Sequence, residues 1–185
     1  MSALTGAQLG LMTGSFLSGC LLSIPLLSIP TITSPTSSPT APILLSSWSS
    51  LYKLGAASMP PLAALTASLY GYTAYKLRST SRTESQKKRW KLFTTAALLT
   101  LYIMPFTLIV MLPTNKALMR LNEMQIEPGP LVSNLQEVRD LVRRWNWLHI
   151  GRSLGPVVGC VVGWFGVFEY DGDVEGEEEK IEKVE

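Results

Sequence analysis

Long apolar stretches separated by shorter polar ones dominate the hydropathy pattern of this chain. Four of them, roughly Leu4–Ile32, Ile43–Tyr75, Leu92–Thr114 and Trp145–Phe168, are long enough to cross a bilayer, which takes about 20 predominantly apolar residues. Backbone groups in hydrocarbon must satisfy their own hydrogen bonds, so each stretch is predicted to be a helix. The pattern therefore predicts an all-α protein built as a bundle of four transmembrane helices.

The connections between these stretches differ in composition. Residues 33–42 are uncharged and rich in Pro, Ser and Thr, which predicts an irregular surface loop. Residues 76–91 hold seven Lys or Arg and one Glu, so the positive-inside tendency places them in the cytosol, and both termini with them. In the third connection, 116–144, apolar residues recur at helical spacing from Leu131 onward, just after Pro130. We expect an amphipathic helix there that runs into the fourth stretch.

Charge is scarce and unevenly placed. Only 16% of residues are charged, whereas about 25% is usual for a soluble domain. Nine of the 14 acidic residues lie in 169–185, a segment with almost no apolar surface to bury. We therefore expect a membrane domain over 1–168 followed by an acidic, disordered tail over 169–185.

Small residues recur at every fourth position in the first and fourth apolar stretches, and at multiples of four in the second. The rows are Gly6, Gly10, Gly14 and Ser18; Gly55, Ala63, Ala67 and Gly71; and Gly151, Gly155, Gly159 and Gly163. Such rows let membrane helices approach closely. Packing within one chain is the simpler interpretation, and a homo-oligomer interface is the alternative.

Polar and aromatic side chains are expected to gather at one end of the predicted bundle. If the stretches alternate in direction, the start of the second, the end of the third and the start of the fourth lie at the same membrane face. The candidates there are Trp48, Tyr52, Lys53, Thr114, Asn115, Trp145, His149 and Arg152. The last three are spaced i, i+4 and i+7, which places them on one face of a helix.

Most of these residues also have a simpler explanation. The tryptophans suit an interfacial belt, and the Lys53 ammonium can extend to the headgroups. Asn115 can cap a helix or hydrogen-bond between helices. His149 ordinarily titrates near neutrality, so it is either a general base or a structural hydrogen-bonding partner. Arg152 lies seven residues into its stretch, where an ionised side chain is unfavourable without a partner or a task, so a ligand-binding or catalytic role is favoured.

Other chemistry is not indicated. The chain has one histidine and two cysteines, Cys20 and Cys160, with no spacing typical of a metal site. It has no phosphate-binding glycine loop, GxSxG, HExxH or CxxC motif. The basic residues of 76–91 fit a cytosolic position beside the membrane better than a nucleic-acid site.

Several motifs resemble the small integral-membrane anthrone oxygenases of fungal aromatic-polyketide pathways. They are SGCLLSIPLL, Trp48 with Tyr52, Gly55, Pro60 and Ala63, PFTLIVMLPTNKAL, and LVRRWNWLHIGRSLGPVVG. The resemblance itself extends over most of residues 10–165. Members of that family often carry Asn at the position of His149, and this departure weakens the assignment of His149 as the base.

The resemblance implies oxidation of an anthrone to an anthraquinone by molecular oxygen, without flavin, haem or metal. Arg152 and Asn115 would stabilise the enolate, with His149 as candidate base. Trp48, Tyr52, Thr114 and Trp145 would line the pocket for a lipophilic aromatic polyketide. The expected location is the endoplasmic reticulum or a related endomembrane. The alternative is a non-catalytic four-helix scaffold or accessory subunit, and Asn115 and Arg152 facing one cavity would favour the enzyme.

Overall fold

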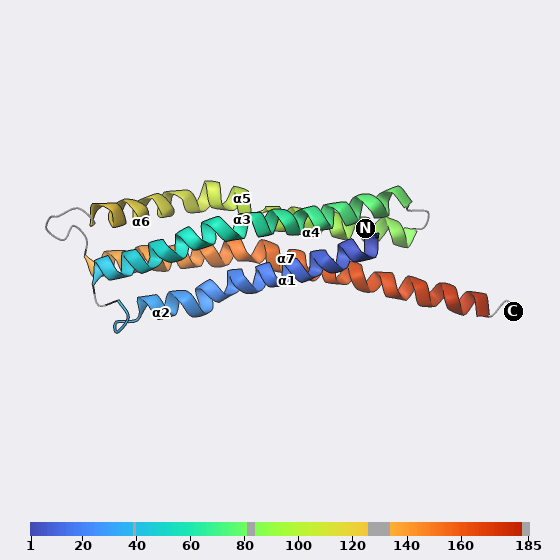
Figure 1. Ribbon diagram of the computed structural model, residues 1–185, viewed down its shortest axis with the longest axis horizontal. Coiled ribbons are helices and arrows are strands. Elements are labelled where there is room, and N and C mark those ends of the chain that lie inside the picture. Colours follow the sequence, from blue (N-terminus) through green and yellow to red (C-terminus); the bar gives the residue numbers. More distant parts are fainter. Residues whose placement is uncertain (39, 81–83, 126–133, 183–185) are drawn as a thin grey trace. The chain divides into compact units, whose positions relative to one another are not determined.

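The computed structural model describes residues 1–38, 40–80, 84–125 and 134–182, and every regular element in these ranges is a helix (Figure 1). The elements are α1 Ala3–Ser23, the π-helix η1 Ile24–Ser28, α2 Ile29–Thr33, α3 Ala41–Thr80, α4 Glu84–Leu101, α5 Ile103–Phe106, the π-helix η2 Thr107–Met111, α6 Leu112–Met124 and α7 Leu135–Glu182. The all-α prediction is confirmed for these residues.

Membrane-spanning capacity is found in three helical stretches of the described ranges. They are Ala3–Thr33, Lys88–Met124 and Leu135–Phe168. The prediction of four spans is therefore supported only in part. Helix α3 has 40 residues, ample length for a span. Its N-terminal half is diluted by the serines and the lysine of SSWSSLYK, so its apolar character is weaker than that of the other three.

Proline positions explain the two π-helices. Pro25 lies inside η1, and Pro113 lies in the first turn of α6, directly after η2. Proline has no N–H to donate to the preceding turn, and a π turn is one way for a helix to continue past that interruption. In contrast, Pro60 and Pro61 lie inside α3 and Pro156 lies inside α7 without ending either helix.

The helix that holds the third apolar stretch continues beyond the end of that stretch. The stretch was predicted to end at Thr114, but α6 extends to Met124. η2 runs directly into α6, so the helix continues past Pro113 by way of the π turn. Asn115 therefore lies inside a helix, where it does not cap the end of one.

The predicted connections agree with the structure in one case and differ in another. Residues 34–38 and 40 are non-helical between α2 and α3, as expected, and residue 39 lies outside the described ranges. Most of 76–91 is helical, because α3 ends at Thr80 and α4 begins at Glu84. Lys, Arg, Gln and Glu are good helix formers, so basic composition does not by itself make a loop. Residues 81–83 lie outside the described ranges.

The last helix is longer than predicted. It begins at Leu135, so Pro130 and Leu131, on which the expected amphipathic start depended, lie outside the described residues. It continues to Glu182, so a disordered tail is not supported as far as that residue. Glutamate and lysine have high helix propensity and can extend a helix that is already formed. Residues 183–185 are not described.

The helices divide into two compact units. Unit 1 consists of Met1–Ser18, Leu62–Tyr102 and Gly155–Glu185, and unit 2 consists of Gly19–Pro61 and Ile103–Leu154. Each unit thus takes a segment of α1, α3, the α4–α6 region and α7.

Unit 1 is packed through small residues. Its core contains Ala7, Tyr70, Ala74, Phe93, Ala96 and Ala97. A Cβ added at Gly155 would lie 2.7 Å from the Leu99 carbonyl oxygen, and one added at Gly163 would lie 2.9 Å from the Tyr70 ring. The glycine rows of α1 and α7 are therefore used for close packing within the chain, which is the simpler of the two interpretations.

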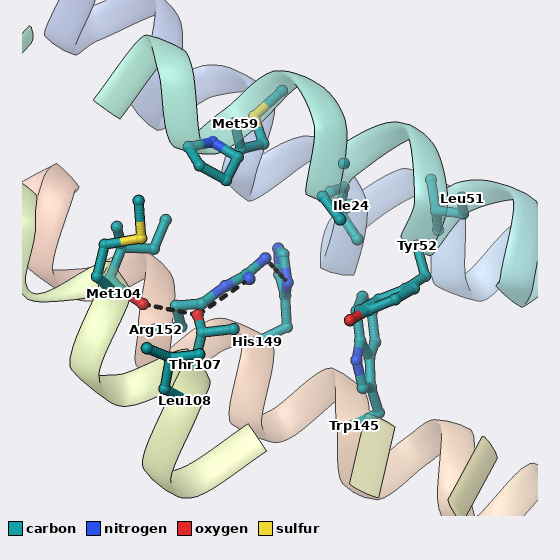
Figure 2. A pocket seen from close by; sticks show the side chains of 14 residues that line it. Ile24, Leu51, Tyr52, Met59, Met104, Thr107, Leu108, Trp145, His149 and Arg152 are labelled. Atoms are coloured by element: carbon teal, nitrogen blue, oxygen red, sulfur yellow. Dashed lines mark hydrogen bonds between the residues drawn. The ribbon is translucent and has the colours of Figure 1, made fainter. Parts of the chain in front are cut away.

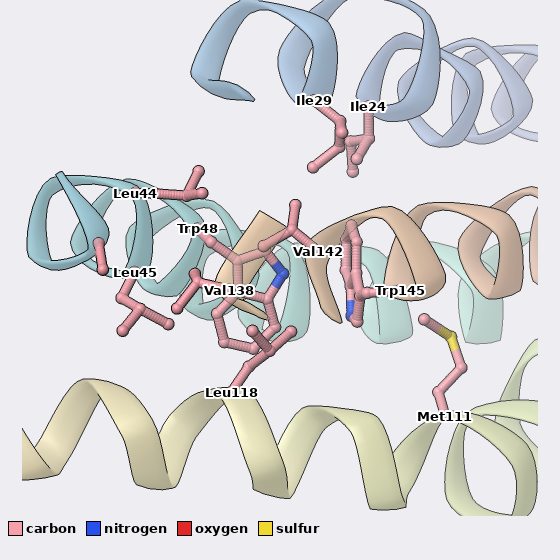
Figure 3. Packing of buried hydrophobic residues seen from close by; sticks show 11 residues of the cluster. Ile24, Ile29, Leu44, Leu45, Trp48, Met111, Leu118, Val138, Val142 and Trp145 are labelled. Carbon is pink, nitrogen blue, oxygen red and sulfur yellow. The ribbon is translucent and has the colours of Figure 1, made fainter. Parts of the chain in front are cut away.

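Unit 2 has the larger apolar core (Figure 3). Four helical segments contribute to it: η1 with α2, the start of α3, η2 with α6, and the start of α7. The buried residues are Ile24, Ile29, Ala41, Leu44, Leu45, Trp48, Met111, Leu118, Val138, Val142 and Trp145. This core packs α3 against α7 directly beside the candidate site, and two of its members, Ile24 and Trp145, also line the cavity.

Candidate active site

A cavity of about 180 Å³ lies within unit 2 (Figure 2). Its wall comes from η1, residues 51–60 of α3, α5 with η2, and α7. Most of the wall is apolar, with Leu51, Met59, Ile103, Met104 and Leu108 among its members. Polar atoms enter it from the side chains of Tyr52, Thr107, His149 and Arg152, beside the Trp145 ring.

Arg152 is the cation of this cavity. Its Nη2 lies 2.8 Å from Nδ1 of His149, and its Nη1 donates to Oγ1 of Thr107 at 3.3 Å. Its Nε is buried and has no hydrogen-bond partner among the described residues. No aspartate or glutamate in those ranges forms a salt bridge with it. The guanidinium is thus held by two neutral acceptors and keeps its full positive charge for a ligand.

His149 connects Arg152 to the first helix. Its Nε2 lies 3.1 Å from the carbonyl oxygen of Leu21. A carbonyl can only accept, so Nε2 carries the ring proton and the lone pair of Nδ1 accepts from Arg152. The side chain is completely buried. Both ring nitrogens are engaged, so the geometry favours His149 as a support for Arg152 over His149 as a proton acceptor.

An aromatic group surrounds the histidine. Trp145 stacks on the His149 ring with centroids 4.9 Å apart, and its indole Nε1 donates to Oδ1 of Asn115 at 2.8 Å. Trp48 meets Trp145 edge-on at 5.8 Å and stacks on Tyr52 at 5.2 Å. These contacts leave the imidazole little freedom to rotate.

The structure brings together only part of the predicted site. Tyr52, Trp145, His149 and Arg152 line the cavity. Trp48, Thr114 and Asn115 are buried but do not line it. Asn115 lies eight residues beyond Thr107, which is about 12 Å along a helix at ~1.5 Å per residue. Its amide therefore fixes the Trp145 indole and does not reach the level of Arg152.

Two contributors were missed by sequence reasoning. Thr107 holds Arg152, and the Leu21 carbonyl holds His149. A signal for Thr107 exists, because it is the only small hydroxyl side chain in the apolar run from Leu101 to Pro113, and polar groups in such runs usually have a task. The Leu21 carbonyl has no comparable signal in the sequence. The only indication is Pro25, four residues later, which has no N–H to donate to it.

Over the described residues, fold and site together define a helical protein with three helices long and apolar enough to span a membrane and a largely apolar cavity lined by one arginine. The anthrone oxygenase family model matches residues 48–162, which include every cavity-lining residue except Ile24. The chain belongs to the anthrone oxygenase family.

Individual relatives agree with this assignment. Anthrone oxygenase AgnL2 of Paecilomyces divaricatus is 35% identical over 90% of this chain and 97% of its own length. Anthrone oxygenase tpcL of Aspergillus fumigatus is 39% identical over 83% of this chain and 87% of its own. The noranthrone monooxygenase of Aspergillus flavus is 34% identical over 86% of this chain and 71% of its own. No solved structure matches the chain.

Proposed function

We propose that this protein oxidises a polyketide anthrone to the anthraquinone with molecular oxygen, in the unit 2 cavity. The observation that carries the proposal is Arg152, a cation without an acidic partner among the described residues, at the wall of an apolar cavity. A flat, lipophilic ring system fits the apolar wall, and an oxygen that becomes negative during the reaction fits the guanidinium.

The chemistry needs little beyond charge stabilisation. Transfer of one proton from the ring methylene to a base turns the anthrone into an electron-rich enolate, and the same proton returns to the peroxide oxygen when the hydroperoxide forms. The enolate reduces dioxygen, and a C–O bond forms at the former methylene carbon to give a hydroperoxide. Breaking the O–O bond with loss of water leaves the second carbonyl. One oxygen atom ends in the quinone and the other in water, so no further reductant is consumed.

Arg152 has the main role in this sequence. The enolate carries its charge on the carbonyl oxygen, and a hydrogen bond from the guanidinium stabilises it more than it stabilises the neutral ketone. Since His149 and Thr107 occupy only part of the guanidinium fork, donors remain for that oxygen. Tyr52 and Trp145 flank the ring plane, and the apolar wall limits access of water.

The reaction is proposed to proceed without flavin, haem or metal. In the described ranges no three His, Cys, Asp or Glu residues are grouped as a metal site, and Cys20 and Cys160 are free thiols. Activity should survive dialysis against chelators, and active protein should show no flavin or haem absorbance. Stoichiometric metal in active, purified protein would overturn this part of the proposal.

The direct test uses purified protein in lipid nanodiscs with emodin anthrone and isotopically labelled dioxygen. Quinone formation should exceed the spontaneous oxidation seen in empty nanodiscs, with one labelled oxygen in the quinone and the other in water. A rate equal to that of empty nanodiscs, with folded protein present, would refute the function.

The membrane arrangement is also part of the proposal. We place α3 across the bilayer as a fourth span and the basic residues around the α3–α4 connection in the cytosol with both termini, in the endoplasmic reticulum or a related membrane. The support is the length of α3 and the excess of Lys and Arg over 76–91.

A further inference from the structure

The first helix reaches the cavity through a backbone carbonyl. Leu21 lies near the end of α1, and its carbonyl oxygen would ordinarily accept from the N–H four residues later. That residue is Pro25, which has no N–H. The Leu21 oxygen is therefore left without its usual helical donor, and Nε2 of His149 lies 3.1 Å from it.

The second contact to Arg152 is also set by a local hydrogen bond. The hydroxyl of Thr107 donates to the Ile103 carbonyl at 2.6 Å. With its only proton engaged, the Thr107 oxygen can serve Arg152 only as an acceptor, and Nη1 lies 3.3 Å from it. Thr107 opens η2, so both contacts depend on a place where an apolar helix departs from regular α geometry.

We propose that Pro25 and Thr107 are positioning residues for the oxidation, because together they fix the orientation of the Arg152 guanidinium. Thr107 acts by direct contact with Arg152. Pro25 acts indirectly, because it frees the Leu21 carbonyl to bind His149, and His149 in turn contacts Arg152. The proposal rests on the proposed function of Arg152. Pro25 selects the ring tautomer with the proton on Nε2, because the vacated carbonyl demands a donor. In that tautomer the lone pair of His149 Nδ1 can accept a hydrogen bond from Arg152 Nη2. Stacking on Trp145 holds the imidazole ring in this orientation.

The tautomer can be measured without any anthrone. The chain contains one histidine, so nitrogen NMR of histidine-labelled protein carrying a histidine-free affinity tag reports on His149 alone. The wild type should show a neutral ring with the proton on Nε2. Pro25→Ala restores an N–H that competes for the Leu21 oxygen, and should shift the ring signals toward a mixture of tautomers.

Pro30→Ala is the matched control. Pro30 lies one turn further along the same apolar stretch, in α2, but it is exposed and its vacated carbonyl belongs to Leu26, which does not line the cavity. Both substitutions replace a proline with a good helix former, so neither should prevent folding. Pro30→Ala should leave the ring spectrum and the rate unchanged.

Kinetics provide the second readout. Pro25→Ala and Thr107→Val should each lower kcat roughly ten- to a hundredfold, the scale expected when a catalytic group is slightly misplaced. KM should change far less, because the apolar wall that binds the ring is intact. Thr107→Ser keeps the acceptor and should recover most of the rate, whereas a merely structural role would follow side-chain volume and favour Val.

The outcomes separate the two proposals. A wild-type ring protonated on Nδ1, or an unchanged ring spectrum and rate in Pro25→Ala, overturns the role of Pro25. Full kcat in Thr107→Val overturns the role of Thr107. If wild-type protein fails to oxidise emodin anthrone while the ring spectra change as expected, the proposed function falls and the aiming of Arg152 stands.

Discussion

Arg152 has an unusual environment for a partly buried cation, with His149 and Thr107 as its partners and no carboxylate among the described residues. An arginine within a membrane helix is unfavourable by about 3 kcal/mol on insertion scales. A purely structural arginine in such a place would ordinarily be paired with an acid. The position of Arg152 beside an apolar cavity is therefore best explained by a ligand that supplies the negative charge during turnover.

Arg152→Leu should lower kcat by a hundredfold or more, the effect of losing one oxyanion donor, while leaving thermal stability unchanged or higher. Quinone formation and a melting curve in the same nanodiscs check both parts. Arg152→Lys keeps the charge but loses the planar fork, so it should recover only part of the rate. Full activity in Arg152→Leu would remove the basis of the site assignment.

His149 should tolerate Asn better than Phe. An asparagine amide has a donor for the Leu21 carbonyl and an acceptor for Arg152, so His149→Asn should stay within about tenfold of the wild-type rate. His149→Phe keeps the ring stacked on Trp145 but has neither group, and leaves Leu21 and Arg152 without partners. It should lose both stability and rate by a larger factor. Equal rates in the two variants would mean that the ring only fills space.

At the scale of the element, the helices explain which site residues could be predicted. Trp145, His149 and Arg152 share one helix, so their spacing was enough to place them together. Tyr52 faces them because the core of unit 2 fixes the register of α3 and α7. Asn115 was misplaced because its position depends on where η2 adds residues to a turn and on α6 continuing past Pro113. Local sequence periodicity cannot predict such long-range geometry. For the same reason it could not predict the contact between the Leu21 carbonyl and His149.

The glycine row of α7 gives a prediction at this scale. Gly155→Ala should lower the free energy of unfolding by about 1–3 kcal/mol, the usual effect of overpacking, because its Cβ would lie 2.7 Å from the Leu99 carbonyl oxygen. Gly71→Ala is the control, since nothing lies within 4 Å of its Cβ position, and it should raise stability by up to ~1 kcal/mol through helix propensity. Thermal unfolding in detergent measures both, and equal melting temperatures would contradict the packing argument.

At the scale of the whole molecule, the sequence predicted the all-helical class and the presence of helices able to span a membrane better than it predicted the number of spans. Three helical stretches of the described residues are long and apolar enough to span a membrane. Helix α3 is long enough but less apolar, because serine, threonine and lysine interrupt its apolar residues. The same hydroxyl-rich segment contains Tyr52, which lines the cavity, and Trp48, which stacks on Tyr52. A helix that lines a polar part of a cavity contains some polar residues, and these lower the mean hydropathy by which membrane spans are recognised.

The number of spans can be determined from the sides of the membrane on which the two termini lie. With α3 across the bilayer the two termini lie on the same side, whereas with three spans they lie on opposite sides. In sealed microsomes, epitope tags at the two ends should therefore show the same accessibility to protease, and both should be cytosolic. A tag reached at one end only would rule out the fourth span and leave α3 outside the bilayer.

The neutral surroundings of Arg152 have a consequence for what happens after the reaction. In the proposed reaction, the enolate carries a negative charge on the oxygen that faces the guanidinium, whereas the quinone carbonyls are neutral. The electrostatic attraction between the ligand and Arg152 therefore weakens when the second carbonyl forms. This loss of attraction is enough to favour product release, with no need for an acidic side chain to compete for Arg152. Quinone should inhibit weakly even when it accumulates in the bilayer, while a planar phenolate that cannot be oxidised should compete strongly with the anthrone.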